Sequence, residues 1–294
     1  MFDRLMRTVG RQSDAMRDRP LFFGSHGQQL YGVFHPTRKP GVDRPVAVFC
    51  HSVGLEHMTS SRLEALGARA IDGMGLPAFR YHARGHGDSE GDYRDVTFHS
   101  LVEDAIAAAD QARRLAGASS VIWVATRFGS LVAAEAMRRR SDAVALVLWE
   151  PVHRGRDFFR DTLRNLLFSQ VAQNQRPNTT VEQSLLLLER EKCIELFGTY
   201  LHLTLYRSAL EGDLEASLSA WNGPTLLVQI QKRQKLSPEN ARLKSAIERH
   251  DQRIVVEVLQ IGDEPAWSMF PHPPYVSDDL IRETVGWVHG LVSS

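Results

Sequence analysis

Residues 121–136 read V-I-W-V-A-T-R-F-G-S-L-V-A-A-E-A, and this stretch decides the fold. Its first six residues are mostly β-branched and apolar, which predicts a buried strand. Its last six residues are rich in alanine, which predicts a helix. Arg127 lies at the centre of the tight turn between them. A strand that passes through a tight turn directly into a helix is the unit from which parallel α/β sheets are built.

The same alternation extends along most of the chain. Apolar runs predict strands at residues 21–23, 29–35, 45–50, 76–81, 143–149, 225–231 and 254–261, and helical spacing predicts helices at residues 61–74, 101–115 and 279–291. Alternation of this length predicts an α/β fold with a mostly parallel sheet that is covered by helices on both faces. Ligands of such sheets bind outside the carboxyl ends of the strands.

The alternation is interrupted between residues 152 and 221. Leucine and aromatic residues recur there at helical rather than strand spacing, so we predict a run of helices without a strand. An insertion after the strand that ends at Trp149 would cover the carboxyl-end face as a cap. The chain is therefore divided into an N-terminal arm or helix (1–20), a core (21–151 and 222–294) and a helical cap (152–221).

The composition excludes several classes of function. Thirty-five basic residues balance 35 acidic residues in a chain of 294, so no net field favours nucleic acid or an anionic membrane. The apolar runs are too short to cross a bilayer, and no integral membrane contact is expected. Cys50 and Cys193 lie in separate apolar runs, so neither a disulfide framework nor a zinc site is expected. The first 20 residues have no apolar core of a signal peptide, and we expect a cytoplasmic protein.

The N-terminal arm carries a short apolar stripe. Phe2, Leu5, Met6 and Val9 share one face if the arm is helical. The arm could be frayed or packed on its own domain. Alternatively, it could be a docking helix for a partner or for a second copy of the chain, which leaves a homodimer possible.

Several segments are similar to those of one family. They are A-V-F-C-H-S-V-G-L-E-H-M at residues 47–58, F-R-Y-H-A-R-G-H-G-D-S-E-G at 79–91, A-T-R-F-G at 125–129, L-W-E-P-V-H-R-G-R-D-F at 148–158 and G-D-E-P-A-W at 262–267. Together they resemble the α/β-hydrolase superfamily, and within it the branch of exosortase-system-associated hydrolases. The likeness spans nearly the whole chain outside the arm and the middle of the cap. It implies an α/β-hydrolase fold with a helical cap insertion.

In active α/β-hydrolases the turn at residues 125–129 reads G-x-S-x-G and holds the nucleophilic serine. Arg127 occupies the serine position, as arginine commonly does in the branch that the chain resembles. The usual places of the other triad members are altered too, because residues 232–235 contain no carboxylate and residues 262–265 contain no histidine. Glu150, one strand earlier, could replace the acid. Hydrolysis through a serine nucleophile is therefore not expected.

Arg127 has chemistry of its own. Its guanidinium stays protonated, so it acts neither as a nucleophile nor as a general base. A cation at a helix N-terminus opposes the helix dipole, so we expect an anion nearby. Glu56, Glu150 and Glu264 lie on loops predicted at the same face of the sheet. Two interpretations remain open: Arg127 forms a structural ion pair, or it grips the carboxylate or phosphate of a ligand.

Other candidate residues surround this turn. Glu150, Glu264 and His57 are the candidate general bases. Candidate substrate-binding residues are Ser52, Val53, Glu56, Phe128, Trp149 and Trp267, and the aromatic residues Phe158, Phe159 and Tyr200 could also line an apolar pocket beneath the cap. The histidines show no metal-binding spacing, so no metal is expected, and no cofactor is expected either.

Two functions of different classes are consistent with these residues. The first is an enzyme that acts on an acyl, ester or thioester-like small molecule without a serine nucleophile, with Arg127 as an electrostatic clamp. The second is a catalytically inactive pseudo-hydrolase that serves as a binding or scaffold module in a biosynthetic pathway. The fold alone does not separate them, because function depends on the site.

Overall fold

The computed structural model describes residues 18–37, 44–172, 179–231, 235–249, 256–261 and 277–293. These residues form an eight-stranded sheet with the strand order β1-β2-β4-β3-β5-β6-β9-β10. The strands are β1 (Arg19–Ser25), β2 (Gln28–His35), β3 (Val46–Cys50), β4 (Ala78–Tyr81), β5 (Val121–Thr126), β6 (Ala143–Trp149), β9 (Thr225–Ile230) and β10 (Val256–Ile261). β1 with β2 and β2 with β4 pair antiparallel, and every other neighbouring pair is parallel. The predicted fold class is confirmed.

The central strands are apolar on both faces because both faces are covered. Every residue of β3, β5 and β9 is buried. Their side chains alternate between two apolar layers, one on each side of the sheet. Strands that are covered on both faces have nearly continuous apolar sequences, which is why the sequence pattern located them.

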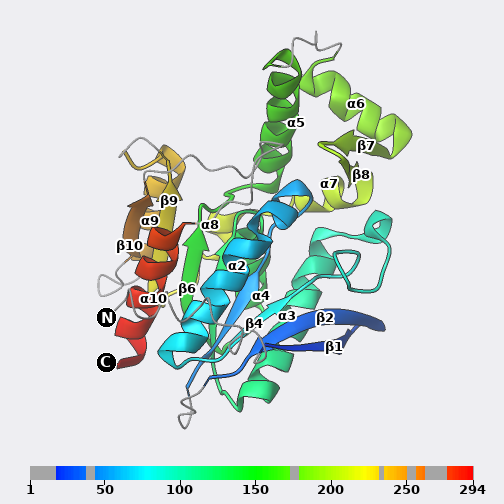
Figure 1. Ribbon diagram of the computed structural model, residues 1–294. Helices are drawn as coiled ribbons and strands as arrows, with labels where there is room; N and C mark the ends of the chain where they lie inside the picture. Colours follow the sequence, from blue (N-terminus) through cyan, green and yellow to red (C-terminus); the bar gives the residue numbers. More distant parts are fainter. Residues whose placement is uncertain are drawn as a thin grey trace.

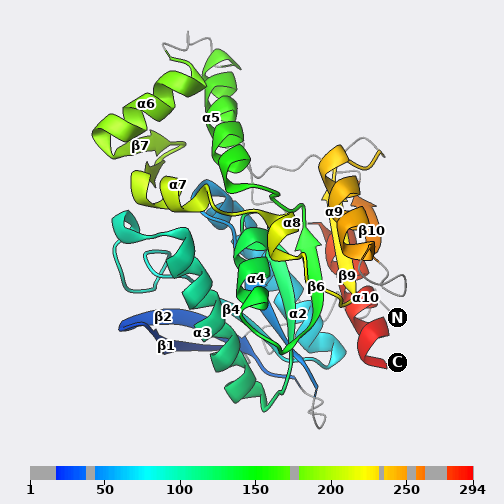
Figure 2. The same cartoon turned by 180° about the vertical axis from the view of Figure 1, so that it is seen from behind.

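Helices form the two outer layers, as Figures 1 and 2 show from opposite sides. One face carries α2 (Leu55–Met74) and α10 (Asp278–Ser293), which pack against each other. The other carries α3 (Phe98–Ala116), α4 (Gly129–Arg138) and α9 (Pro238–Glu248). Within the described part of the chain, none of the helices has the length and apolar character that a membrane crossing requires.

The insertion, residues 152–221, lies between β6 and β9. Its helices are α5 (Gly155–Ala172), α6 (Val181–Glu191), α7 (Leu203–Ala209) and α8 (Leu214–Ser217). α5 and α6 project beyond the sheet, and α7 lies nearer to the core (Figures 1 and 2). Gly155 begins α5 in close contact with the core-side end of α7, since a Cβ atom there would lie 2.0 Å from the Ala209 carbonyl oxygen.

The prediction of an insertion without a strand was wrong. β7 (Cys193–Leu196) and β8 (Thr199–His202) form an antiparallel hairpin. Phe197 and Gly198 make its two-residue turn with φ angles of 53° and 79°, which is the backbone of the tight turns that favour hairpins. The strands are four residues each, too short for alternation to be told from helical spacing.

The N-terminal arm lies mostly outside the described residues. β1 begins at Arg19, so residues 19 and 20 belong to the first strand rather than to the arm. The apolar stripe of the arm and its alternatives therefore stay predictions. The same holds for Glu264 and Trp267, which also fall outside the described residues.

Candidate functional site

The strand-turn-helix unit at Arg127 has the backbone of a nucleophile elbow. Arg127 follows β5 with a φ of 52°, in the left-handed region, and α4 begins two residues later at Gly129. A Cβ atom at Gly129 would lie 2.1 Å from the Cys50 carbonyl oxygen, so only glycine fits where α4 passes the end of β3. A non-glycine residue held at positive φ costs about 1–3 kcal/mol. The surrounding contacts must therefore hold Arg127 in place.

The guanidinium of Arg127 is hydrogen-bonded to other groups of the protein. Its Nε lies 3.2 and 3.3 Å from the two carboxylate oxygens of Glu56, and its Nη2 donates to Oε1 of the same residue at 3.1 Å. Nη1 donates to the backbone carbonyl of Glu150 at 3.2 Å. The Glu56 side chain is 7% exposed and that of Arg127 is 21% exposed. This is a largely buried, bidentate ion pair, the geometry in which arginine and carboxylate match best.

The ion pair also sets the charge state of Arg127. Burial by itself lowers the pKa of the Arg127 guanidinium, but the charge and hydrogen bonds of Glu56 outweigh it and raise the pKa above its usual value. The cation is therefore permanent, and the anion expected beside it is Glu56. Glu56 lies in the first turn of α2, where a carboxylate also interacts favourably with the helix dipole.

Ser52 connects this ion pair to the turn. Its hydroxyl donates to Glu56 Oε2 at 2.8 Å and accepts the backbone N–H of Phe128 at 3.3 Å. In α/β-hydrolases the N–H of the residue after the nucleophile is one donor of the oxyanion hole. The equivalent N–H here is that of Phe128, and an internal hydroxyl occupies it.

Glu150 is committed to the backbone. It has a φ of 45° directly after β6, and its carboxylate accepts the N–H of Ile230. Burial raises the pKa of Glu150, and the Ile230 hydrogen bond and the charge of Arg127 counteract part of the rise. Its contact with Arg127 is made by the backbone carbonyl. The carboxylate therefore joins the ends of β6 and β9.

His57 lies in a cluster of buried imidazoles. The ring centroids of His51 and His57 are 4.3 Å apart, and His86 lies 5.2 and 5.4 Å from them. Burial, and then the neighbouring histidines, lower the pKa of His51 and His57 well below the usual range, and burial lowers that of His86 to about 4. Within the described residues, His57 Nδ1 and His86 Nε2 have no hydrogen-bond partner. These rings are neutral and therefore weak bases.

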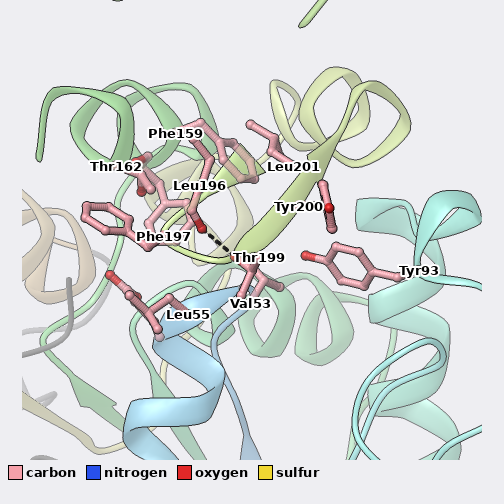
Figure 3. A pocket seen from close by; sticks show the side chains of 13 residues that line it. Val53, Leu55, Tyr93, Phe159, Thr162, Leu196, Phe197, Thr199, Tyr200 and Leu201 are labelled. Atoms are coloured by element: carbon pink, nitrogen blue, oxygen red, sulfur yellow. Dashed lines mark hydrogen bonds between the residues drawn. The ribbon is translucent and has the colours of Figure 1, made fainter. Parts of the chain in front are cut away.

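A pocket lies beside the ion pair, between the core and the insertion, with about 450 Å³ of space that is partly open to solvent. Its walls come from the start of α2, the short helix η1 (Tyr93–Asp95), α5 and the β7–β8 hairpin. The lining side chains are mostly apolar or aromatic: Val53, Leu55, Glu56, Tyr93, Phe158, Phe159, Thr162, Leu196, Phe197, Thr199, Tyr200 and Leu201. Figure 3 shows Tyr93 and Tyr200 on one side of the pocket. Glu56 belongs to both the pocket wall and the ion pair.

The candidate substrate-binding residues divide into two groups. Val53 and Glu56 line the pocket, whereas Ser52 and Phe128 are buried behind it. The Phe128 ring packs against Phe158 and Phe159, whose rings form part of the wall.

Trp149 does not line the pocket. Its indole is fully buried on the opposite side of the sheet, where it packs on Phe49 and donates to Thr284 of α10 at 3.0 Å. The expectation of a ligand contact for Trp149 is corrected by this placement. It fails because the last residue of a strand faces whichever layer the alternation dictates.

Several residues that line the pocket were not predicted from the sequence. Tyr93, Thr162 and Phe197 carry no motif, and the hairpin that presents Phe197 was not expected. Burial, partly offset by a hydrogen bond with the Gly54 backbone, raises the pKa of Tyr93 to about 12, so its hydroxyl stays protonated. The glycine before α2 was an available signal for a tight turn at this wall, since Gly54 has a φ of 60°, which favours glycine.

The other potentially reactive side chains near the turn are inert. Cys50 is fully buried, and burial raises the pKa of its thiol to about 12. Ser130 exchanges two hydrogen bonds of 3.0 Å with the backbone of Val152. In the part of the chain that the structure describes, no group of three or more histidine, cysteine or acidic side chains is arranged to hold a metal ion.

The sequence matches a known family. Residues 44–196, just over half of the chain, match the Hydrolase_4 family, described as serine aminopeptidase, S33. The chain therefore belongs to this family of α/β-hydrolases, although Arg127 stands at its elbow. No curated protein matches the chain significantly.

Solved structures agree with this fold. Est1E from Butyrivibrio proteoclasticus, solved with ferulic acid, is 14% identical, with a TM-score of 0.62 over 92% of this chain and 97% of that protein. DcsB, in complex with a substrate analogue, is 15% identical, with a TM-score of 0.63 over 94% of this chain and all of DcsB. The Pyrococcus furiosus esterase Pf2001 is 11% identical, with a TM-score of 0.60 over 94% and 90% of the two chains. The protein is thus a hydrolase-like protein with an α/β-hydrolase fold.

Proposed function

We propose that this protein is a pseudo-hydrolase that binds an apolar small molecule in the pocket beneath the insertion and does not cleave it through a nucleophile at the elbow. The insertion serves as the cap of this pocket. The observation that carries the proposal is the closed network in which Arg127, Glu56, Ser52 and the Phe128 N–H satisfy one another. A catalytic site needs free groups at the same place, and these groups are already paired.

The other candidate nucleophiles near the turn also support the proposal, because neither Cys50 nor Arg127 is suited to covalent catalysis. A nucleophile must be exposed to substrate and activated by a base or a lowered pKa. Cys50 has neither property, because its thiol is fully buried and its pKa is raised. Arg127 itself remains a cation.

The lining indicates the class of ligand. The pocket has about 450 Å³ of space that is partly open to solvent, so a ligand could enter it from the surface. Phe158, Phe159 and Phe197 offer aromatic surface, which favours an acyl chain or an aromatic ring. The Tyr93 hydroxyl, which stays protonated, offers a hydrogen-bond donor for one end of the ligand. A medium-chain or aromatic acid, or its ester, has this combination of an apolar body and a polar end.

The test combines labelling with binding. A fluorophosphonate probe should leave the full chain unlabelled, and clear labelling would refute the proposal. Medium-chain and aromatic acids and their methyl esters should raise the melting temperature in proportion to their affinity. Thr162→Trp, which fills the pocket, should abolish this shift, whereas Gln170→Trp, on the same helix but outside the lining, should keep it. Equal shifts in both variants would place the ligand elsewhere.

A second candidate rests on the residual exposure of Arg127. Its side chain is 21% exposed, and its partner Glu56 forms part of the pocket wall. A ligand carboxylate could displace Glu56, and Arg127 would then clamp an acyl, ester or thioester-like substrate for a reaction without a serine, with Glu150 as the general base. Turnover of an ester or thioester that is lost in both Arg127→Ala and Glu150→Gln, with binding retained in Glu150→Gln, would select this enzyme over the pseudo-hydrolase.

A further inference from the structure

A second groove lies at the far edge of the sheet, away from the pocket. It runs between the edge strand β10, its neighbour β9 and α10, with about 860 Å³ of space that is partly open to solvent. The lining residues are Leu226, Glu257, Val258, Leu259, Glu283, Gly286, Trp287, Gly290 and Leu291. The floor of the groove is therefore apolar, and the carboxylates of Glu257 and Glu283 also belong to the lining.

The side of α10 that borders the groove is built for close approach. Gly286 and Gly290 are four residues apart, so they share one face of the helix. Glycine inside a helix is about 1 kcal/mol less favourable than alanine. A Cβ atom at Gly286 would meet nothing within 4 Å, so the packing seen in the described residues does not require glycine there. A further segment of backbone lying against this face would explain it, as small residues allow helices to pack closely.

We propose that this groove is the docking site of the chain's own N-terminal arm, residues 1–17. The arm has apolar residues at helical spacing: Phe2, Leu5, Met6 and Val9. A helix of about nine residues carries such a stripe over about 13 Å. Its apolar face would cover the floor formed by Leu259 and Trp287.

Charge favours the arm over other occupants. Residues 1–17 contain four arginines and two aspartates, so the arm is positive. The groove carries Glu257, which is exposed, and Glu283, which pairs in part with Arg282 at 3.2 Å. The segment at 262–276 follows β10 directly, but its charged residues are the acidic Asp263 and Glu264. Like charges would oppose its docking beside Glu257, whereas the arm is attracted.

The place where the arm leaves the body is compatible with this docking. Asp18 is the first described residue, and its carboxylate pairs with His35 and Arg69, both at 2.8 Å. Arg69 belongs to α2, which packs against α10 in the same layer (Figure 1). Seventeen residues span about 25 Å as a helix and more when part of them is extended.

Hydrogen exchange of the full chain tests the proposal with a matched pair of variants. Leu5→Asp places a charge in the apolar stripe, and Thr8→Asp adds the same charge beside it. Leu5→Asp should speed the exchange of the amides in residues 257–261 and 283–291 about tenfold, the effect of losing about 1.4 kcal/mol of local protection. Thr8→Asp should leave it nearly unchanged. Equal exchange in all three chains would overturn the proposal.

A change on the groove side gives an independent test. Gly286→Trp fills the groove and should expose the arm, so that the amides of residues 2–10 exchange faster than in the unchanged chain. Exchange of the arm that is already unprotected in the unchanged chain contradicts the proposal. Protection that rises with protein concentration, together with a dimer mass in light scattering, also contradicts it and assigns the groove to the arm of a second copy.

Discussion

The ion pair between Arg127 and Glu56 should be worth much more to the fold than a surface pair. Arg127→Met removes the cation and leaves the Glu56 carboxylate, 7% exposed, with the hydrogen bond from the Ser52 hydroxyl. Removing one member of a buried pair costs about 3–5 kcal/mol. Because Arg127 is 21% exposed, water screens part of the interaction, and we expect about 3 kcal/mol, the lower end of that range.

The double variant separates the cost of leaving one buried charge unpaired from the loss of the ion pair itself. Arg127→Met combined with Glu56→Met leaves no uncompensated charge, so its loss of stability should be smaller than the sum of the two single losses by about 2 kcal/mol. Arg164→Met is the control, because Arg164 pairs with Asp161 on the surface of α5, with both side chains at least half exposed. A surface pair contributes about 0–1 kcal/mol.

Urea unfolding at pH 7, followed by tryptophan fluorescence and circular dichroism, measures these free energies. Comparison of midpoints at a constant slope gives the change in the free energy of unfolding. The reasoning fails if Arg127→Met costs no more than Arg164→Met, or if the two single losses simply add. Either result would mean that the ion pair does not hold the elbow.

Two further outcomes follow from the same region. Gly129→Ala should prevent soluble folding or cost more than about 3 kcal/mol, because its Cβ atom would lie 2.1 Å from the Cys50 carbonyl oxygen, whereas Gly73→Ala, where a Cβ atom meets nothing, should be neutral or stabilising in thermal melts. The unfolded chain protonates His86 below about pH 6.5, but the folded chain resists protonation down to about 4. Stability should therefore decrease as pH falls from 6.5 to 4, by about 3 kcal/mol for this residue, and His86→Phe should reduce the slope of the urea midpoint against pH; an unchanged slope would contradict this assignment.

Much of the fold could be predicted because its signals are local. The apolar runs of β3, β5, β6 and β9 reflect burial on both faces, and the turn at Arg127 stands between a clear strand and a clear helix. The start of α2 at Leu55 was placed six residues too late, because the residue before it, Gly54, carries no capping side chain. The β7–β8 hairpin was not predicted, because its strands are too short to show a strand pattern.

The site could be predicted in part. The need of Arg127 for an anion follows from its charge alone, and Glu56 was among the three candidates. The choice between Glu56 and Glu150 depends on how far each carboxylate reaches, and Glu150 turns its own toward β9. The Phe128 amide taken by Ser52 depends on two loops that are 76 positions apart in the chain, so spacing contains no trace of it.

The bridging hydroxyl of Ser52 has a consequence for the history of the fold. Arg127→Ser would restore the motif of a hydrolase, but the Phe128 N–H would still be donated to Ser52, and Glu56 would be left buried without its cation. Each corrective change is therefore useful only when the others are present. Because of this network, a single substitution at Arg127 is not expected to restore a serine hydrolase.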